Sequence, residues 1–285
     1  TLVSNASSNA GPKKLKGKQI GMIHLGPAQT SPFQEVRLFS HKGISHSVFS
    51  GGEGPGIFLM HELRGMTEEF WRLANWLSEH FTVWAPDLFG ASDEPTPADP
   101  NKLFFKACIS REIHLFAKND PGPISQWLRA LSQDLHVQTG GAGIGAIGMC
   151  MTGNFALSLA LDPWVVAPVC SQPALPAKTL FGGNECRLQM MPEERRILKD
   201  RDVDVMALRF DGDQLCRAAR FAAIRELVGD DRLNAHVIAD EHRSPDGPLK
   251  FPHSVLTADL IDEDESVTKR KLREVIAFLG ERLTI

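Results

Sequence analysis

One cysteine stands at a spacing that can make it a nucleophile. In residues 143–161, GIGAIGMCMTGNFALSLAL, a run of small and apolar residues ends at Cys150, and an apolar helix is expected to begin at once. Gly148 precedes the cysteine and Gly153 follows it, and small residues at such positions let a strand turn sharply into a helix. The pattern predicts a nucleophile elbow with cysteine in place of serine.

The predicted helix after Cys150 should also activate the thiol. Its first amide groups lack partners within the helix, and together with the helix dipole they favour the thiolate, which is the nucleophilic form. The alternative is a buried structural cysteine, which is a common fate of free cysteine. That alternative does not account for Gly148 and Gly153 at the two turn positions.

A cysteine nucleophile needs a base to take its proton and an acid to orient that base. In strand–turn–helix elbows these partners follow in the order nucleophile, acid, histidine. Asp211 and Asp213 both follow the apolar segment 203–210, and we favour Asp213 because it lies beyond the glycine turn. His253, in the expected loop before the last helix, is the candidate base, and His242 competes with it. The alternatives are a solvated loop histidine and, for Asp213, a helix N-cap.

Hydrophobic periodicity predicts the elements that position these side chains. Strands are expected at residues 35–39, 46–49, 57–60, 82–85, 165–170, 203–210, 235–239 and in the run before Cys150. Helices are expected at residues 67–80, 123–137, 215–227 and 267–283, after Cys150, and from near Pro192. This alternation predicts an α/β fold with one mostly parallel sheet of about eight strands and helices on both faces. We expect a single domain over residues 31–285 and a mobile, polar N-terminal arm over residues 1–30.

The composition favours a small-molecule role. The 285 residues are 42% hydrophobic with a net charge of −4, which allows a substantial core and gives no reason to expect nucleic acid or a membrane as partner. The five cysteines are odd in number and contain no C-x-x-C pair, so neither a zinc site nor a disulfide framework is expected. We expect no metal or cofactor and a cytoplasmic location. The sequence does not decide the oligomeric state.

From about Glu35 to the C-terminus, the chain resembles the dienelactone hydrolase family of α/β-hydrolases. The matching pieces are, in chain order, His61-Glu62-Leu63, Ala85-Pro86-Asp87-Leu88, the elbow at Cys150, residues 210–216 around Asp213, and Pro252-His253-Ser254-Val255. The resemblance implies a triad of Cys150, Asp213 and His253. It also implies an oxyanion hole from the amides of Leu63 and Met151. In addition, it implies that Glu62 approaches the resting thiol and helps to switch it to the nucleophilic state; a helix cap is the alternative.

The chain departs from this family where the substrate carboxylate is held. Dienelactone-cleaving members use two arginines, and this chain has Phe89-Gly90-Ala91 and Val255-Leu256-Thr257 at those places. Losing two bidentate donors removes most recognition of a carboxylate. Arg64 is a candidate substitute, and simple exposure is its alternative. We therefore expect a substrate site that includes Arg64 and Phe89 and prefers neutral, moderately apolar esters or lactones.

The sequence thus predicts a hydrolase of carboxylic esters or lactones that forms an acyl-enzyme at Cys150. The alternative is a non-enzymatic relative that binds a small ligand or partner, with Cys150 as a structural or redox thiol. The presence of Cys150, Asp213, His253 and Glu62 together argues against it, because a binding protein has no need of all four.

Overall fold

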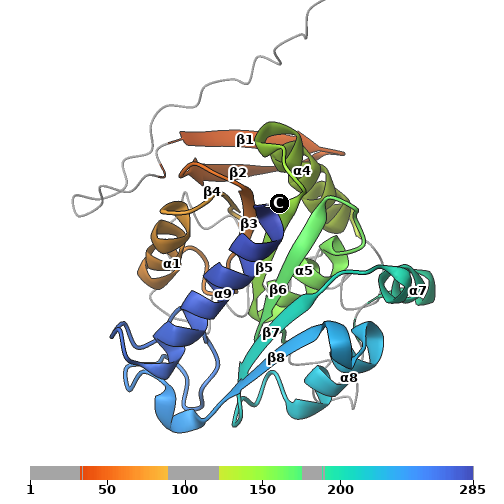
Figure 1. Cartoon of the computed structure of the whole chain (residues 1–285). Helices are drawn as coiled ribbons and strands as arrows, with labels where there is room; N and C mark the ends of the chain where they lie inside the picture. The colour runs from red at the N-terminus through yellow and green to blue at the C-terminus, as the bar shows by residue number, and fades with distance from the viewer. Residues whose placement is uncertain (1–32, 34, 89–121, 175–187, 189, 285) are drawn as a thin grey trace, which may run out of the picture.

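The centre of the protein is a twisted eight-stranded sheet. A computed structural model describes residues 33, 35–88, 122–174, 188 and 190–284. The strand order is β1-β2-β4-β3-β5-β6-β7-β8 (Figure 1). The strands are β1 (Glu35–His41), β2 (Ile44–Gly51), β3 (Gly56–Met60), β4 (Thr82–Pro86), β5 (Ile144–Met149), β6 (Val165–Ser171), β7 (Val205–Phe210) and β8 (Leu233–Ile238). Strands β3 to β8 are parallel and β1 and β2 pair antiparallel at one edge, which confirms the predicted mostly parallel sheet.

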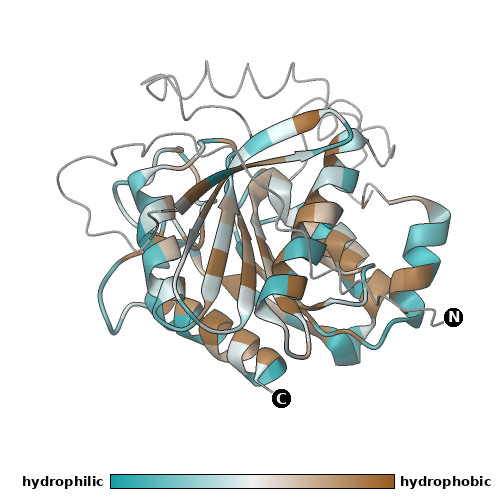
Figure 2. Ribbon diagram, turned by 90° about the horizontal axis from the view of Figure 1, so that it is seen from above, coloured by the Kyte–Doolittle hydropathy of each residue, from teal (hydrophilic) through white to brown (hydrophobic). Residues whose placement is uncertain are grey.

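Helices cover both faces of this sheet. One face carries α1 (Glu68–Ser78) and α9 (Val267–Leu283), and in Figure 1 the dark blue α9 runs in front of the central strands. The other face carries α4 (Pro123–Thr139), α5 (Gly153–Leu159), α7 (Pro192–Asp200) and α8 (Ala218–Val228). Figure 2 shows hydrophobic residues gathered in the central strands and hydrophilic ones toward the outside. This two-sided burial explains why the parallel strands read as nearly continuous apolar runs.

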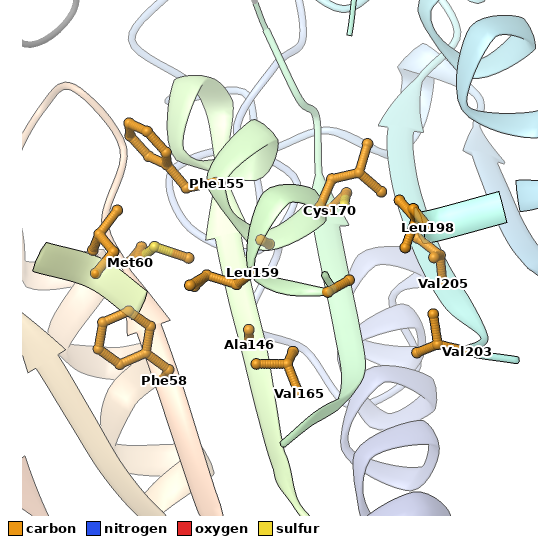
Figure 3. Packing of buried hydrophobic residues seen from close by; sticks show 14 of the residues in the cluster. Phe58, Met60, Ala146, Phe155, Leu159, Val165, Cys170, Leu198, Val203 and Val205 are labelled. Atoms are coloured by element: carbon orange, nitrogen blue, oxygen red, sulfur yellow. The ribbon is translucent and has the colours of Figure 1, made fainter. Parts of the chain in front are cut away.

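Helix α5 is the element that fixes the predicted nucleophile. All of its residues except Ser158 are buried. Figure 3 shows Phe155 and Leu159 of this helix among side chains from β3, β5, β6 and β7. Full burial of a Leu or Phe side chain stabilises a fold by about 1.5–3 kcal/mol. The N-terminal end of α5, next to Cys150, is therefore held firmly against the sheet.

Several predicted boundaries shift by a few residues for local reasons. Helix α8 begins at Ala218 rather than Leu215, because the amides of Leu215 and Cys216 donate to the carboxylate of Asp213 instead of opening a helix. Thr67 caps α1 as predicted, with its hydroxyl accepting from the amide of Phe70 at 3.4 Å. The predicted arm at residues 1–30 lies outside the described residues.

Among the helices that the structure describes, none is long and apolar enough to cross a membrane.

Candidate active site

The backbone at Cys150 forms the sharp turn that the sequence predicts. The cysteine follows β5 and opens a short 3-10 helix (Cys150–Thr152), and its φ of +55° lies in the strained left-handed region. A Cβ atom at Gly148 would lie 2.1 Å from the carbonyl oxygen of Thr152, so only glycine fits there. A Cβ at Gly153 would lie 3.0 Å from Cα of Pro173, which follows β6. Glycine is thus required at position 148, and a side chain at position 153 would press against Pro173.

Thr152 ties this elbow to the end of β3. Its buried hydroxyl accepts from the amide of Met149 at 2.8 Å and lies 3.1 Å from the carbonyl oxygens of both Met60 and His61. Glu62 and Leu63 follow directly in the chain. Sequence pattern alone does not assign this role to Thr152, although its place inside the elbow is a usable signal.

The structure brings Asp213 and His253 together. Nδ1 of His253 donates to Oδ2 of Asp213 at 2.8 Å, and both side chains are buried. A carboxylate only accepts, so this bond places the proton on Nδ1. Oδ1 of the same carboxylate accepts from the amides of Leu215 at 2.8 Å and Cys216 at 3.0 Å. Asp213 therefore both orients the histidine and caps the turn before α8.

The competing acid and base lie elsewhere. The side chain of Asp211 is 73% exposed and pairs with Arg209 at 3.1 Å. His242 belongs to a short 3-10 turn (Asp240–His242), and no hydrogen bond or ion pair within the described chain joins it to Asp213. The geometry thus favours Asp213 over Asp211 as the acid and His253 over His242 as the base. Sequence spacing alone did not exclude Asp211 or His242.

Electrostatic interactions connect His253 to Cys150. Burial lowers the pKa of His253, but the charge of Cys150 and the hydrogen bond with Asp213 outweigh burial and hold the pKa well above its ordinary value. Nε2 of His253 is buried and has no hydrogen-bond partner of ordinary geometry within the described residues, yet both the charge of Cys150 and a hydrogen-bonding interaction with it raise the pKa of His253. The arrangement can stabilise a thiolate beside an imidazolium.

The carboxylate of Glu62 is buried and held by two hydroxyl groups. Oε1 accepts from Thr257 at 2.5 Å, and Oε2 accepts from Ser254 at 2.8 Å. None of the hydrogen bonds found for this carboxylate within the described residues goes to Cys150. The hydroxyl of Thr257 occupies a position where the resemblance placed an arginine, so Glu62 has two neutral donors there. No sequence pattern predicts that Ser254 and Thr257 donate to Glu62.

Asp259 anchors the loop that carries His253. Its fully buried Oδ2 accepts from the amides of His253 and Ser254, each at 2.9 Å. Nε of Arg243 lies 3.2 Å from Oδ1 of the same carboxylate. No local pattern in the sequence marks Asp259, because its partners are defined only once the loop has folded back on itself.

The residues predicted for the oxyanion hole and for substrate binding have different surroundings. Met151 packs in a small cluster with Cys150 and Ala174, and Leu63 packs against that cluster. The amides proposed for the oxyanion hole therefore lie on the two segments next to the cysteine. Burial raises the pKa of Glu69 in α1, but its hydrogen bond with Thr67 and the charge of Arg64, among others, lower it overall, so Arg64 acts on that carboxylate. Phe89 lies outside the described residues.

The remaining described thiols are poor nucleophiles. Burial raises the pKa of Cys170 to about 12, and burial followed by the charge of Asp213 raises that of Cys216 well above its ordinary value. Within the part of the chain that the structure describes, no group of three or more His, Cys, Asp or Glu side chains is arranged to hold a metal ion. Among the described thiols, Cys150 therefore stays the candidate nucleophile.

Comparisons with known proteins agree with this architecture. Residues 45–181 match the sequence model of the dienelactone hydrolase family, whereas none of the curated proteins matches the chain. The chain is similar to a solved structure assigned as a dienelactone hydrolase from Klebsiella pneumoniae subsp. pneumoniae, with 16% identity, 87% of this chain and 98% of that chain covered, and a TM-score of 0.59. It is also similar to one assigned as a lipase from Acinetobacter baumannii, with 14% identity, 88% and 92% covered, and a TM-score of 0.56. The chain thus has the α/β-hydrolase fold, and its residues 45–181 are similar to the dienelactone hydrolase family.

Proposed function

We propose that this protein hydrolyses carboxylic esters or lactones through an acyl-enzyme formed on Cys150. The observation that carries the proposal is the position of His253. Its Nδ1 donates a 2.8 Å hydrogen bond to Asp213, and the charge of Cys150 raises its pKa. This chain of three groups at a strand-to-helix turn has the order and roles that nucleophilic acyl transfer needs.

In the proposed reaction, His253 holds the proton of the Cys150 thiol while the thiolate attacks the substrate carbonyl carbon. The amides of Met151 and Leu63 stabilise the negative oxygen of the tetrahedral intermediate. Collapse of that intermediate breaks the ester bond, and the imidazolium gives its proton to the leaving oxygen. His253 then takes a proton from water, which attacks the thioester, releases the acid and restores the thiol. Asp213 keeps the imidazole in the tautomer that these transfers require.

The proposed substrate is neutral and moderately apolar. The hydroxyl of Thr257 is committed to Glu62 at 2.5 Å, and the charge of Arg64 acts on Glu69. Thr257 therefore offers no bidentate clamp for a substrate carboxylate, and Arg64 stays a proposed contact of the substrate. We retain Phe89 as a proposed contact of the substrate. For matched substrates, kcat/KM should be higher for the neutral ester than for its carboxylate-bearing analogue, because that ratio reports transition-state binding by the site.

The free thiols of Cys150, Cys170 and Cys216 support the proposed cytoplasmic location.

The purified protein should be tested against a panel of short aryl esters and lactones. Cys150→Ala is the test variant, and Cys170→Ala is the matched control, since Cys170 is a buried thiol on the neighbouring strand β6. We expect hydrolysis by the wild type and by Cys170→Ala, and loss of hydrolysis in Cys150→Ala. Failure of the wild type on the whole panel, or full activity in Cys150→Ala, would leave the non-enzymatic binding alternative as the better account.

A further inference from the structure

Gln172 occupies the same place after β6 that Cys150 occupies after β5. Met149 and Ser171 are partners in the parallel register of these strands, so the next residue of each lies at the same edge of the sheet. Both next residues have left-handed backbones, with φ of +55° for Cys150 and +34° for Gln172. Among the other described non-glycine residues, only Lys42, in the turn between β1 and β2, has a positive φ. The backbone at Gln172 therefore carries strain directly beside the proposed nucleophile.

The side chain of Gln172 reaches the loop that carries His253. Its fully buried Oε1 accepts from the amide of Val255 at 3.3 Å and also from the hydroxyl of Ser171. Because a backbone amide can only donate, the contact with Val255 shows which end of the side-chain amide is the oxygen. Val255 lies two residues beyond His253, so Gln172 links that loop to the end of β6.

The residues after Gln172 also touch the elbow. The amide of Ala174 donates to the carbonyl oxygen of Cys150 at 3.0 Å. Nδ2 of Asn154, in the first turn of α5, donates to the carbonyl oxygen of Ala174 at 2.7 Å. Ala174 therefore contacts the elbow directly, while the side chain of Gln172, two residues earlier, contacts the histidine loop.

The nitrogen end of Gln172 indicates that this residue serves more than packing. Nε2 is buried and has no hydrogen-bond partner among the described residues. Unpaired buried donors and a left-handed backbone both destabilise the folded state. A methionine would fill a similar volume without leaving donors unpaired. The position thus keeps a costly residue whose oxygen makes the contact with the histidine loop.

We propose that Gln172 is a positioning residue of the hydrolase site, which holds the His253 loop against the Cys150 elbow by accepting a hydrogen bond from Val255. This inference rests on the proposed hydrolase function. In this proposal Gln172 does not contact the substrate. Removing its side-chain oxygen should therefore change kcat and the reactivity of Cys150 rather than KM.

The test compares Gln172→Met with Gln172→Glu and with Ser132→Ala as matched control. Gln172→Met removes the acceptor at similar length, whereas Gln172→Glu keeps an oxygen for Val255, loses the unpaired donors and adds a buried carboxyl group. Ser132 is a fully buried residue of α4 that accepts from the indole N–H of Trp164 at 3.0 Å. For each variant, kcat, KM, the urea midpoint and the pH dependence of Cys150 alkylation should be measured.

We expect Gln172→Met to lower kcat about 10- to 100-fold, since small displacements of catalytic groups cost rates of this order. KM should change by less than about threefold, and the alkylation profile of Cys150 should move to higher pH. Gln172→Glu should lose less of kcat, and it provides the comparison if Gln172→Met does not fold. Ser132→Ala should lower the urea midpoint at least as much without changing the alkylation profile.

A rise in KM with unchanged kcat would overturn the proposal, because it would make Gln172 a substrate contact. Unchanged kcat and alkylation in Gln172→Met would also overturn it. If the wild type hydrolyses no ester, the alkylation profile still decides: a shift in Gln172→Met supports positioning of His253 although the hydrolase proposal fails, and an unchanged profile refutes positioning itself.

Discussion

Oε1 of Glu62 accepts a 2.5 Å hydrogen bond from the hydroxyl of Thr257, four residues beyond His253 in the chain. Ser254, which directly follows that histidine, donates to the second carboxylate oxygen at 2.8 Å. The end of β3 is thereby bonded to the loop that carries the proposed base. Both oxygens of this buried carboxylate have a hydrogen-bond donor. Because the group carries charge, losing either hydroxyl should lower the stability of the fold.

Removing the hydroxyl in Thr257→Val should therefore destabilise the protein through Glu62. In a double-mutant cycle with Glu62→Gln, we expect a coupling free energy of about 1.5–3 kcal/mol, as for hydrogen bonds to charged groups. Urea unfolding of the two single variants and the double variant measures it. Thr268→Val is the control, since Thr268 is equally buried and accepts from the amide of Ile261 at 3.0 Å. Additive effects of Thr257→Val and Glu62→Gln would contradict the assigned contact.

The two aspartates after β7 should respond differently to substitution. Asp213→Asn keeps the shape of the side chain but can favour the wrong tautomer of His253, so kcat should fall by about 10³-fold or more. Asp211→Asn, at an exposed side chain paired with Arg209, should change kcat by less than about twofold. Steady-state kinetics on one aryl ester measures both. Equal losses in the two variants would indicate a general structural effect.

Alkylation of the native protein should be selective for Cys150. With a pKa of about 12, Cys170 is a thiolate in only about one molecule in ten thousand at pH 8. Burial raises the pKa of Cys216 in the same direction. Iodoacetamide labelling followed by peptide mass spectrometry should find Cys150 modified first, and more slowly in His253→Ala. Labelling of Cys170 at a comparable rate would contradict the assignment of those thiols.

The buried His61 should make the fold sensitive to acid. Burial lowers the pKa of His61 from its ordinary value of 6.5, and its Nε2 accepts from the amide of Leu88 at 3.0 Å. Because the folded pKa is the lower one, stability is complete above about pH 6.5 and is lost as pH falls toward the folded pKa, by up to about 1.4 kcal/mol per pH unit.

The matched variant for this effect is His61→Gln, which keeps an acceptor for Leu88 and does not titrate. Urea unfolding at several pH values between 7 and 5 should show a smaller loss of stability in His61→Gln than in the wild type. Identical slopes for the two proteins would mean that another group causes the acid sensitivity.

The sequence could identify the residues of the site that depend on local patterns. Cys150 lies between glycines that only a tight turn requires, and Asp213 and His253 follow apolar segments that end at one edge of the sheet. The glycine turn between Asp211 and Asp213 only favoured Asp213, and the structure separates the two by their partners, His253 for Asp213 and Arg209 for Asp211. Gln172 and Asp259 could not be found, since their partners are backbone amides of the folded histidine loop.

The start of α8 illustrates the same limit. Periodicity extends the helical pattern back to Leu215, but the carboxylate of Asp213 captures the amides of Leu215 and Cys216. The residue that delays the start of the helix, Asp213, is thus also the residue that orients His253 in the folded protein. Local propensity does not contain that information.

In the proposed reaction, the substrate acyl group is transferred to the sulfur of Cys150. Acid quenching of the wild type during turnover of a short aryl ester, followed by intact-mass and peptide analysis, tests it directly. We expect a mass increase of one acyl group located on Cys150, and no such adduct in Cys150→Ala. An adduct on another residue, or undiminished turnover in Cys150→Ala, would contradict it.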